Sequence, residues 1–182
     1  MRIVGGRLKG RTLMAPEGKE LRPTADRVRE AVFNILAHGV NGFEFDAATV
    51  IDVFAGTGAL GLEALSRGAA HCLFVEEDKQ AIDTIRANID ALDARARSTV
   101  QAGSVMGLGP AKQQTDLILL DPPYDTGAGQ VALDRMIRLG WIGPATWIAL
   151  ETARDEDIAV RTLAVEAERN IGKAKLTILR PE

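Results

Sequence analysis

Two short stretches of the sequence hold residue types that could bind a nucleotide cofactor and transfer a group to an amine. The first covers residues 50–65 and reads Val-Ile-Asp-Val-Phe-Ala-Gly-Thr-Gly-Ala-Leu-Gly-Leu-Glu-Ala-Leu. An apolar, β-branched run breaks at glycines and continues with helical spacing, which predicts a buried parallel strand, a tight turn and a helix. Glycines let a ligand approach the backbone and a helix N-terminus offers unpaired N–H groups, so this unit predicts a nucleotide site.

The spacing of Gly56, Gly58 and Gly61 also matches a dinucleotide fingerprint, and Glu76 follows Gly58 by 18 residues, where a ribose-binding acid is expected. NAD is nevertheless disfavoured, because Asp52 lies inside the strand just before the glycines and would repel a pyrophosphate. S-adenosylmethionine (SAM) carries a sulfonium and an ammonium group and no phosphate, so it tolerates this carboxylate. The predicted contacts to SAM are Asp52, Phe54, Ala55, Gly56, Gly58 and Glu76.

Simpler interpretations of the same residues remain open. A glycine turn can pack a helix on a sheet without any ligand, although such a turn rarely needs a buried acid as well. Glu76 can be an acid at a helix N-terminus, a role that Glu77 or Asp78 could serve equally.

The second stretch, Asp121-Pro122-Pro123-Tyr124, follows an apolar run. Two prolines restrict the backbone and remove two N–H donors, which leaves a stiff loop of hydrogen-bond acceptors beside a planar ring. Such a loop suits a planar base with an exocyclic amine: the amine donates to Asp121 and the Pro122 carbonyl while Tyr124 stacks on the base. Catalysis is then orientation plus electrostatic stabilisation of the positive charge that grows on nitrogen. The alternative is an ordinary strand-to-loop turn with a packed tyrosine.

Strands that alternate with helices must position these residues. Strands are expected from residue 50 and at 71–75, 99–102, 116–120, 146–150, 162–168 and 174–180, and helices at 24–37, after the glycines, at 79–92, weakly near 105–112 and at 128–139. The order predicts an α/β fold with a doubly wound, mostly parallel seven-stranded sheet. Ligands bind such sheets at the carboxyl ends of the strands, so Asp52–Gly58, Glu76, residues 103–104 and 121–124 should share one rim.

The N-terminal residues predict a small basic β-hairpin over residues 2–16, which contains no acid and which we expect to be flexible and to become ordered on a phosphate backbone. Residues 1–38 hold eight basic and four acidic residues, a net charge of +4, whereas the remainder carries −7. A basic arm on an acidic body predicts nucleic-acid contact, although a solvated basic surface would look the same. We divide the chain into this appendage, residues 1–22, and a catalytic domain, residues 23–182.

Composition excludes several classes of protein. The single cysteine, Cys72, lies in a predicted strand and is interpreted as a core thiol, which excludes a disulfide framework. His, Cys and Asp show no metal-ligand spacing, and no apolar run approaches the length of a membrane span. A cytoplasmic monomer without metal is therefore expected.

The whole chain resembles the RsmD family, the bacterial 16S rRNA (guanine-N2)-methyltransferases. The residues that carry the resemblance are 2–6, 10–11, 21–30, 33–34, 52–69, 121–124 and 140–141. The resemblance implies a class I SAM-dependent methyltransferase fold and, as target, the guanine at position 966 of 16S rRNA in the small ribosomal subunit. It also implies that Thr24 lies near the methionine end of SAM. Ser104 stands where many relatives have an acid or amide that contacts adenine, so a carbonyl or hydroxyl contact replaces it.

The residues expected to contact rRNA are Arg2, Arg7, Lys9, Arg11, Arg22 and Arg27. The alternatives are another amino methyltransferase acting on DNA adenine or protein glutamine, an RNA-binding assembly factor with a vestigial SAM site, and an NAD-dependent oxidoreductase. The first shares the Asp-Pro-Pro-Tyr stretch but does not need the hairpin. Intact Asp52, Glu76 and Asp121 argue against the second, and the third lacks an obvious proton-transfer residue.

Overall fold

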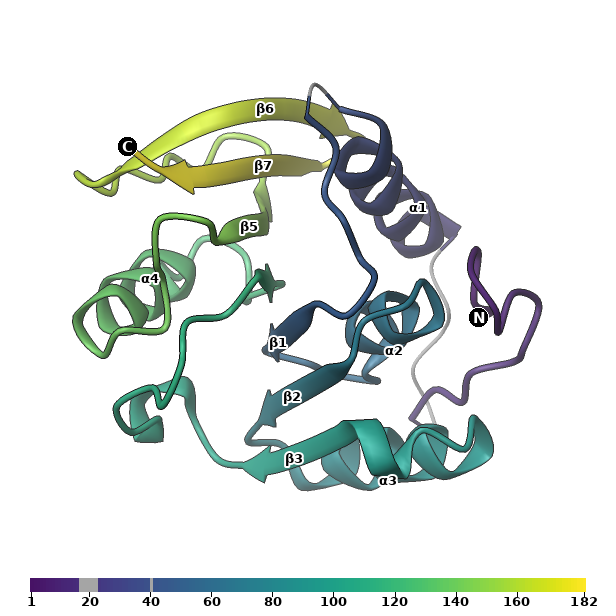
Figure 1. The fold of residues 1–182 in the computed structure, drawn as a ribbon. Coiled ribbons are helices and arrows are strands. Elements are labelled where there is room, and N and C mark those ends of the chain that lie inside the picture. The colour runs from purple at the N-terminus through teal and green to yellow at the C-terminus, as the bar shows by residue number, and fades with distance from the viewer. Residues whose placement is uncertain (17–22, 40) are drawn as a thin grey trace.

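The structure, a computed structural model, describes residues 1–16, 23–39 and 41–182. Seven strands form one sheet in the order β3-β2-β1-β4-β5-β7-β6, in which β1 to β5 are parallel and β7 runs antiparallel to both of its neighbours (Figure 1). The strands are β1 Thr49–Val53, β2 His71–Glu76, β3 Ser98–Ala102, β4 Leu117–Leu120, β5 Trp147–Ala153, β6 Leu163–Ile171 and β7 Ala174–Pro181. The predicted doubly wound, seven-stranded sheet is confirmed.

Helices cover both faces of the sheet. They are α1 Pro23–His38, α2 Ala59–Ser66, α3 Lys79–Ala91 and α4 Ala128–Arg138. Alternate residues of a strand point to opposite faces, so neighbouring strand residues enter different cores. Val50 packs in the core that includes residues of α1, α2 and α3, whereas Ile51 packs in the core that includes residues of α4. Figure 1 shows α4 on one side of the sheet and α1 to α3 on the other.

Three local features differ from the sequence-based expectations. The predicted helix near 105–112 is only a short 3-10 turn, Val105–Gly107, within a stretch rich in glycine and polar residues. Helix α1 begins at Pro23 rather than after Thr24, as a proline in a first helical turn allows. The N-terminal segment forms a single antiparallel bridge, Arg2 with Thr12, instead of two strands.

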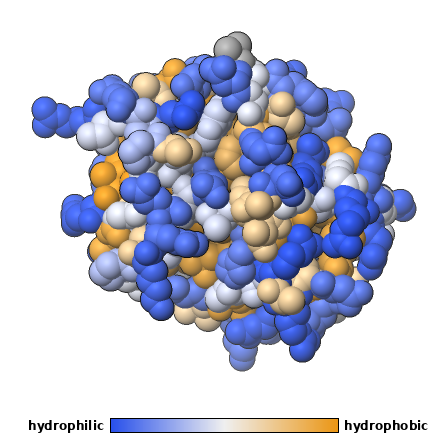
Figure 2. All heavy atoms as spheres, viewed as in Figure 1, coloured by the Kyte–Doolittle hydropathy of each residue, from blue (hydrophilic) through white to orange (hydrophobic). Residues whose placement is uncertain are grey.

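The N-terminal segment is also not the flexible arm that its composition suggested. Ile3, Leu8 and Leu13 are buried in the same core as α1, α2 and α3. The segment therefore packs on the domain through buried apolar side chains. In the described part of the chain, no helix combines the length and apolar character needed to cross a bilayer. The face seen in Figure 2 is mostly hydrophilic, with hydrophobic side chains in small separate patches.

Candidate active site

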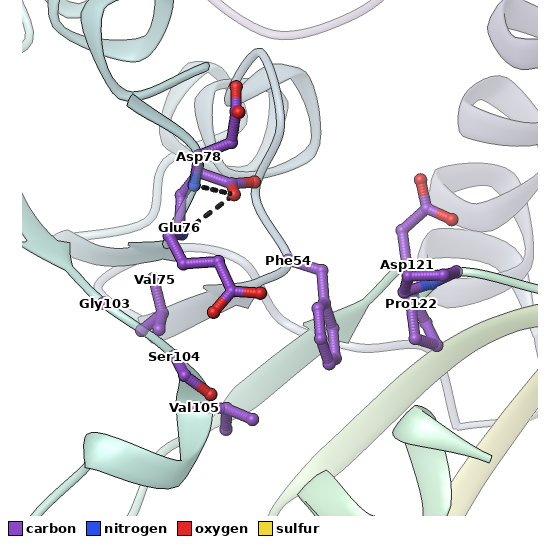
Figure 3. A pocket seen from close by; sticks show the side chains of 11 residues that line it. Phe54, Val75, Glu76, Asp78, Gly103, Ser104, Val105, Asp121 and Pro122 are labelled. Atoms are coloured by element: carbon purple, nitrogen blue, oxygen red, sulfur yellow. Dashed lines mark hydrogen bonds between the residues drawn. The ribbon is translucent and has the colours of Figure 1, made fainter. Parts of the chain in front are cut away.

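A cavity of about 350 Å³ lies at the carboxyl ends of β1, β2, β3 and β4 (Figure 3). Its described lining residues are Phe54, Val75, Glu76, Glu77, Asp78, Gly103, Ser104, Val105, Asp121, Pro122 and Pro123. Four of these are acidic and none is basic, so the site disfavours a phosphate group and favours a cation. Phe54, Val75, Val105 and the two prolines supply apolar walls, which suit a planar ring system.

The glycine loop between β1 and α2 has an unusual backbone. Phe54, Gly56 and Gly58 have φ angles of 60°, 58° and 80°, so three alternate residues adopt the left-handed conformation. This conformation is strained for a bulky side chain and is typically retained where function requires it. In Figure 3 the ring of Phe54 extends from the loop in the same direction as the ring of Pro122. A side chain at Gly61 would collide with Phe74 and Cys72, so glycine there lets α2 pack closely on β2.

Asp52 lies beneath the glycine loop and does not line the cavity. Its side chain is fully buried, and its Oδ2 accepts a hydrogen bond of 2.9 Å from the N–H of Gly61. Burial raises its pKa from 3.8 to about 8, the Gly61 N–H opposes that rise, and the charge of Glu76 adds to it. Asp52 therefore anchors the start of α2, and its predicted contact to SAM stays a prediction. Ala55 is likewise buried, at 8% exposure.

Glu76 holds the glycine loop against the end of β2. Its Oε1 accepts from Gly56 N at 2.8 Å, and its Oε2 accepts from the N–H groups of Glu77 and Asp78, both at 2.9 Å (Figure 3). A carboxylate has about four acceptor positions, so one remains for a ligand hydroxyl. The Asp78 side chain caps α3 by accepting from Ala81 N at 2.9 Å. The helix-capping role that was open for Glu76 thus belongs to Asp78.

Ser104 lies on the cavity wall as well. Its hydroxyl accepts a hydrogen bond of 3.1 Å from Met106 N and so caps the short turn Val105–Gly107. This local bond occupies the hydroxyl with its own backbone, although the hydroxyl proton remains available to an acceptor on a ligand.

The predicted catalytic residues follow β4 directly. Pro122 is buried, whereas Tyr124 is 41% exposed and donates a hydrogen bond of 2.5 Å to Oε1 of Glu151, a residue of β5. In Figure 3 the Asp121 carboxylate points away from the ring of Pro122. The structure therefore brings Asp121 and Pro122 into the cavity wall and places Tyr124 beside an acid that the sequence analysis did not select.

The environment of Asp121 raises the pKa of its carboxyl group. Solvent reaches this carboxyl, yet surrounding protein removes part of its hydration, and the carboxylates of Glu151 and Asp52 lie nearby. Lost hydration and then Glu151 raise the pKa of Asp121 well above its usual value. A substitution at Glu151 tests the second of these causes directly.

The predicted RNA contacts are mostly accessible. Arg2, Arg7, Lys9 and Arg27 are exposed, and none of them forms an ion pair with an acid in the described ranges. Arg11 is exposed too, but its Nη2 donates to the carbonyl of Ala91 at the end of α3, at 2.5 Å. Arg22 and the side chain of Thr24 lie outside the described part of the chain.

Glu63, in α2, anchors the N-terminal segment and was not selected from the sequence. Its fully buried carboxylate accepts from Val4 N at 2.8 Å and from Gly5 N at 2.9 Å. Arg67 and Arg29 lie beside it, at 3.1 and 3.9 Å. Nearby, the Ser66 hydroxyl accepts from Leu8 N and donates to the carbonyl of Gly5, at 2.9 and 2.6 Å.

Asn88, in α3, connects the same segment to the glycine loop. It is fully buried; its Oδ1 accepts from Met14 N at 2.7 Å, and its Nδ2 donates to the carbonyls of Met14 and Thr57 at 3.1 and 3.0 Å. The N-terminal segment and the glycine loop therefore share one buried side chain.

Both missed acids had a signal in the sequence. Glu151 follows the apolar run Ile-Ala-Leu, the same pattern that drew attention to Asp121 after β4. Glu63 is a lone acid in an otherwise apolar helix, which implies a buried partner. The predicted core thiol is confirmed, because Cys72 is fully buried and burial raises its pKa. No group of three His, Cys, Asp or Glu side chains that could hold a metal occurs among the described residues.

Comparison with known proteins agrees with this geometry. The sequence model of a family described as Conserved hypothetical protein 95 matches residues 1–180. Ribosomal RNA small subunit methyltransferase D of Escherichia coli is 35% identical over 152 residues, 84% of this chain and 74% of that protein. The protein of the same name from Haemophilus influenzae is 32% identical over 162 residues, 87% of this chain and 81% of that protein.

Solved structures show the same fold. The Escherichia coli protein yhhF, named as a candidate methyltransferase, has a TM-score of 0.85 and 31% identity, and the match covers 100% of this chain and 98% of that chain. A conserved hypothetical protein of Streptococcus pyogenes has a TM-score of 0.73 and 28% identity, over 85% of this chain and 95% of that chain. The sheet order and these likenesses confirm the class I methyltransferase fold. The match along residues 1–180 and the identity to the curated relatives show that the chain belongs to the RsmD family of methyltransferases.

Proposed function

We propose that this chain uses SAM to methylate the exocyclic N2 amine of one guanine in 16S rRNA, the guanine at position 966. The observation that carries the proposal is that Asp121, Pro122 and Tyr124 follow β4 directly and that Asp121 and Pro122 line an acidic cavity. The proposal includes action in the cytoplasm, as a monomer without metal, on an assembled or assembling small subunit. The relatives' printed names support ribosomal RNA of the small subunit as the substrate.

The described residues fit SAM as the methyl donor. Glu76, Glu77, Asp78 and Asp121 give the cavity the negative charge that a sulfonium and an ammonium group require. Glu76 retains one acceptor position for a ribose hydroxyl, and Phe54 with Val105 offers apolar walls to a flat base. When bound, SAM supplies an electrophilic methyl group on sulfur.

The chain's own residues orient the acceptor amine. The two N–H groups of the amine donate to the Asp121 carboxylate and the Pro122 carbonyl, while the Tyr124 ring stacks on the base. These bonds draw the nitrogen lone pair out of conjugation and aim it at the methyl carbon. With SAM bound, transfer would form the N–C bond and break the C–S bond, and the Asp121 carboxylate would stabilise the positive charge that develops on nitrogen.

The N-terminal segment, residues 1–22 in the proposed division of the chain, supplies the RNA-binding surface. Arg2, Arg7 and Lys9 are exposed on a segment that buried contacts hold in place. A preordered basic surface binds a phosphate backbone without an ordering cost at the moment of binding.

The test is methyl transfer from labelled SAM to unmodified 16S rRNA, to small subunits that lack the modification, to duplex DNA and to ribosomal proteins. Digestion of the labelled RNA and identification of the nucleoside follow. N2-methylguanine from one position in the rRNA is the expected product. Label in DNA adenine or protein glutamine would contradict the proposed rRNA substrate and support the alternative amino methyltransferase. SAM binding without any methyl transfer would instead support an RNA-binding assembly factor with a vestigial SAM site.

A further inference from the structure

Glu151 lies where two strands of the sheet bring their ends together. Strands β4 and β5 are parallel, and Leu120 of β4 is paired with Leu150 of β5. The residues that follow this pair are Asp121 and Glu151, so two acids occupy neighbouring positions at the edge of the sheet. Glu151 is half-buried, and its side chain lies among residues already assigned to the reaction.

Glu151 acts on both polar side chains of the Asp-Pro-Pro-Tyr loop. Its Oε1 accepts the hydrogen bond of 2.5 Å from the Tyr124 hydroxyl. At the neighbouring strand end, the charge of Glu151 acts on the carboxyl group of Asp121 and raises its pKa. Asp52, from β1, is the other acid that acts on the pKa of Asp121, and it raises that pKa as well.

We propose that Glu151 is a positioning residue for methyl transfer, which holds the Tyr124 ring through its hydroxyl and places a second carboxyl group beside Asp121. This inference rests on the proposed function. It adds a residue from β5 to a site otherwise built from the ends of β1, β2, β3 and β4.

Methyl transfer releases one proton from the substrate amine, and Asp121 accepts it. The amine nitrogen forms a bond to the methyl carbon, the C–S bond breaks with its electron pair on sulfur, and the nitrogen then carries one positive charge. The Asp121 carboxylate accepts the extra proton from nitrogen, which leaves a neutral secondary amine, and later releases the proton to water. A neighbouring negative charge raises the affinity of Asp121 for that proton.

The experiment compares the wild type with Glu151→Gln, which keeps the size of the side chain and removes its charge. Because the like charge is lost, the acid limb of the kcat profile should move to lower pH by about one unit or more. With a weaker base at Asp121, kcat on the plateau should fall about tenfold or more, while the Kd for SAM changes less than twofold. The matched control, Glu168→Gln on the exposed side of β6, should leave both the limb and the plateau unchanged.

A second measurement does not depend on turnover. Carbon-13 NMR titration of the Asp121 carboxyl group should show a lower pKa in Glu151→Gln than in the wild type. Equal titration of Asp121 in both proteins, or an acid limb that does not move, would overturn the inference. Failure of the proposed function would instead appear in the wild type, as a product other than N2-methylguanine, and would leave the NMR comparison intact.

Discussion

Asp52 shows how one residue can support a site without touching its ligand cavity. The carboxyl group is fully buried; one oxygen is bonded to Gly61 N, and the other, Oδ1, has no hydrogen-bond partner among the described residues. Its pKa of about 8 means that it is largely neutral at pH 7 in the folded protein. A neutral acid costs far less to bury than a carboxylate, which explains how the strand accommodates it.

The raised pKa of Asp52 predicts a specific dependence of stability on pH. In the unfolded chain the group ionises near 3.8, and in the folded protein near 8. Its contribution to stability is therefore fully present below the lower value and is lost as the pH rises through the higher one. Asp52→Asn removes this dependence. Between pH 5 and pH 8.5 the wild type should therefore lose a few kcal/mol more of its free energy of unfolding than the variant does. Urea unfolding at the two pH values checks this, and an unchanged difference would contradict the burial argument.

At the scale of elements, the N-terminal segment depends on a buried acid in α2. Replacing Glu63 by Gln leaves Arg67 and Arg29 beside a neutral amide and turns one of its oxygens into a donor facing an N–H group. Breaking a buried pair in this way should lower the free energy of unfolding by roughly 3 kcal/mol. Chemical unfolding measures the change, with the exposed Glu30→Gln on α1 as the matched control. A loss below about 0.5 kcal/mol, which is ordinary for a surface site, would show that Glu63 does not hold the segment.

The elements also show how far sequence reasoning reaches. Strands β1, β2 and β4 have strong apolar runs and were predicted within about one residue, because a short continuous apolar run is typical of a buried parallel strand. The N-terminal segment was misjudged as flexible. Its glycines and basic residues were visible, but the carboxylate that orders Val4 and Gly5 comes from Glu63, 59 and 58 residues away. Local patterns carry no information about such a partner.

The candidate site also contains residues that the sequence predicted and residues that it did not. The strand-end rule correctly placed Phe54, Glu76, Ser104 and Asp121 around one cavity, because parallel strands must end at one edge of the sheet. It did not show that Asp52 lies under the loop, since the direction of a side chain depends on pleat and register. Pairing of β5 with β4 brings Glu151 to Tyr124, and that pairing is a property of the folded sheet.

At the scale of the whole molecule, charge is distributed unevenly, with +4 in residues 1–38 and −7 in the remainder. The acidic cavity favours a cationic cofactor, and the exposed basic residues of the N-terminal segment favour a polyanion. Neutralising Arg7 and Lys9 by glutamine should weaken RNA binding and reduce the salt slope by about 0.7–0.9 per lost phosphate contact. Binding across a range of salt concentrations measures the slope. The matched pair Lys112 and Arg154, exposed outside this segment, should leave it unchanged; equal slopes for both double variants would remove the segment from the RNA interface.

The most direct test of the proposed active site is methyl transfer by Asp121→Ala, measured together with SAM binding by calorimetry. Asp121 holds the substrate amine in the proposed reaction, whereas Glu76 and Phe54, which also line the cavity, remain as the proposed contacts to the cofactor. The variant should bind SAM within about threefold of the wild type and lose transfer to the small subunit by about 10³-fold or more, while the exposed Asp134→Ala on α4 retains full activity. Transfer by Asp121→Ala at the wild-type rate would contradict the assignment of this cavity as the catalytic site.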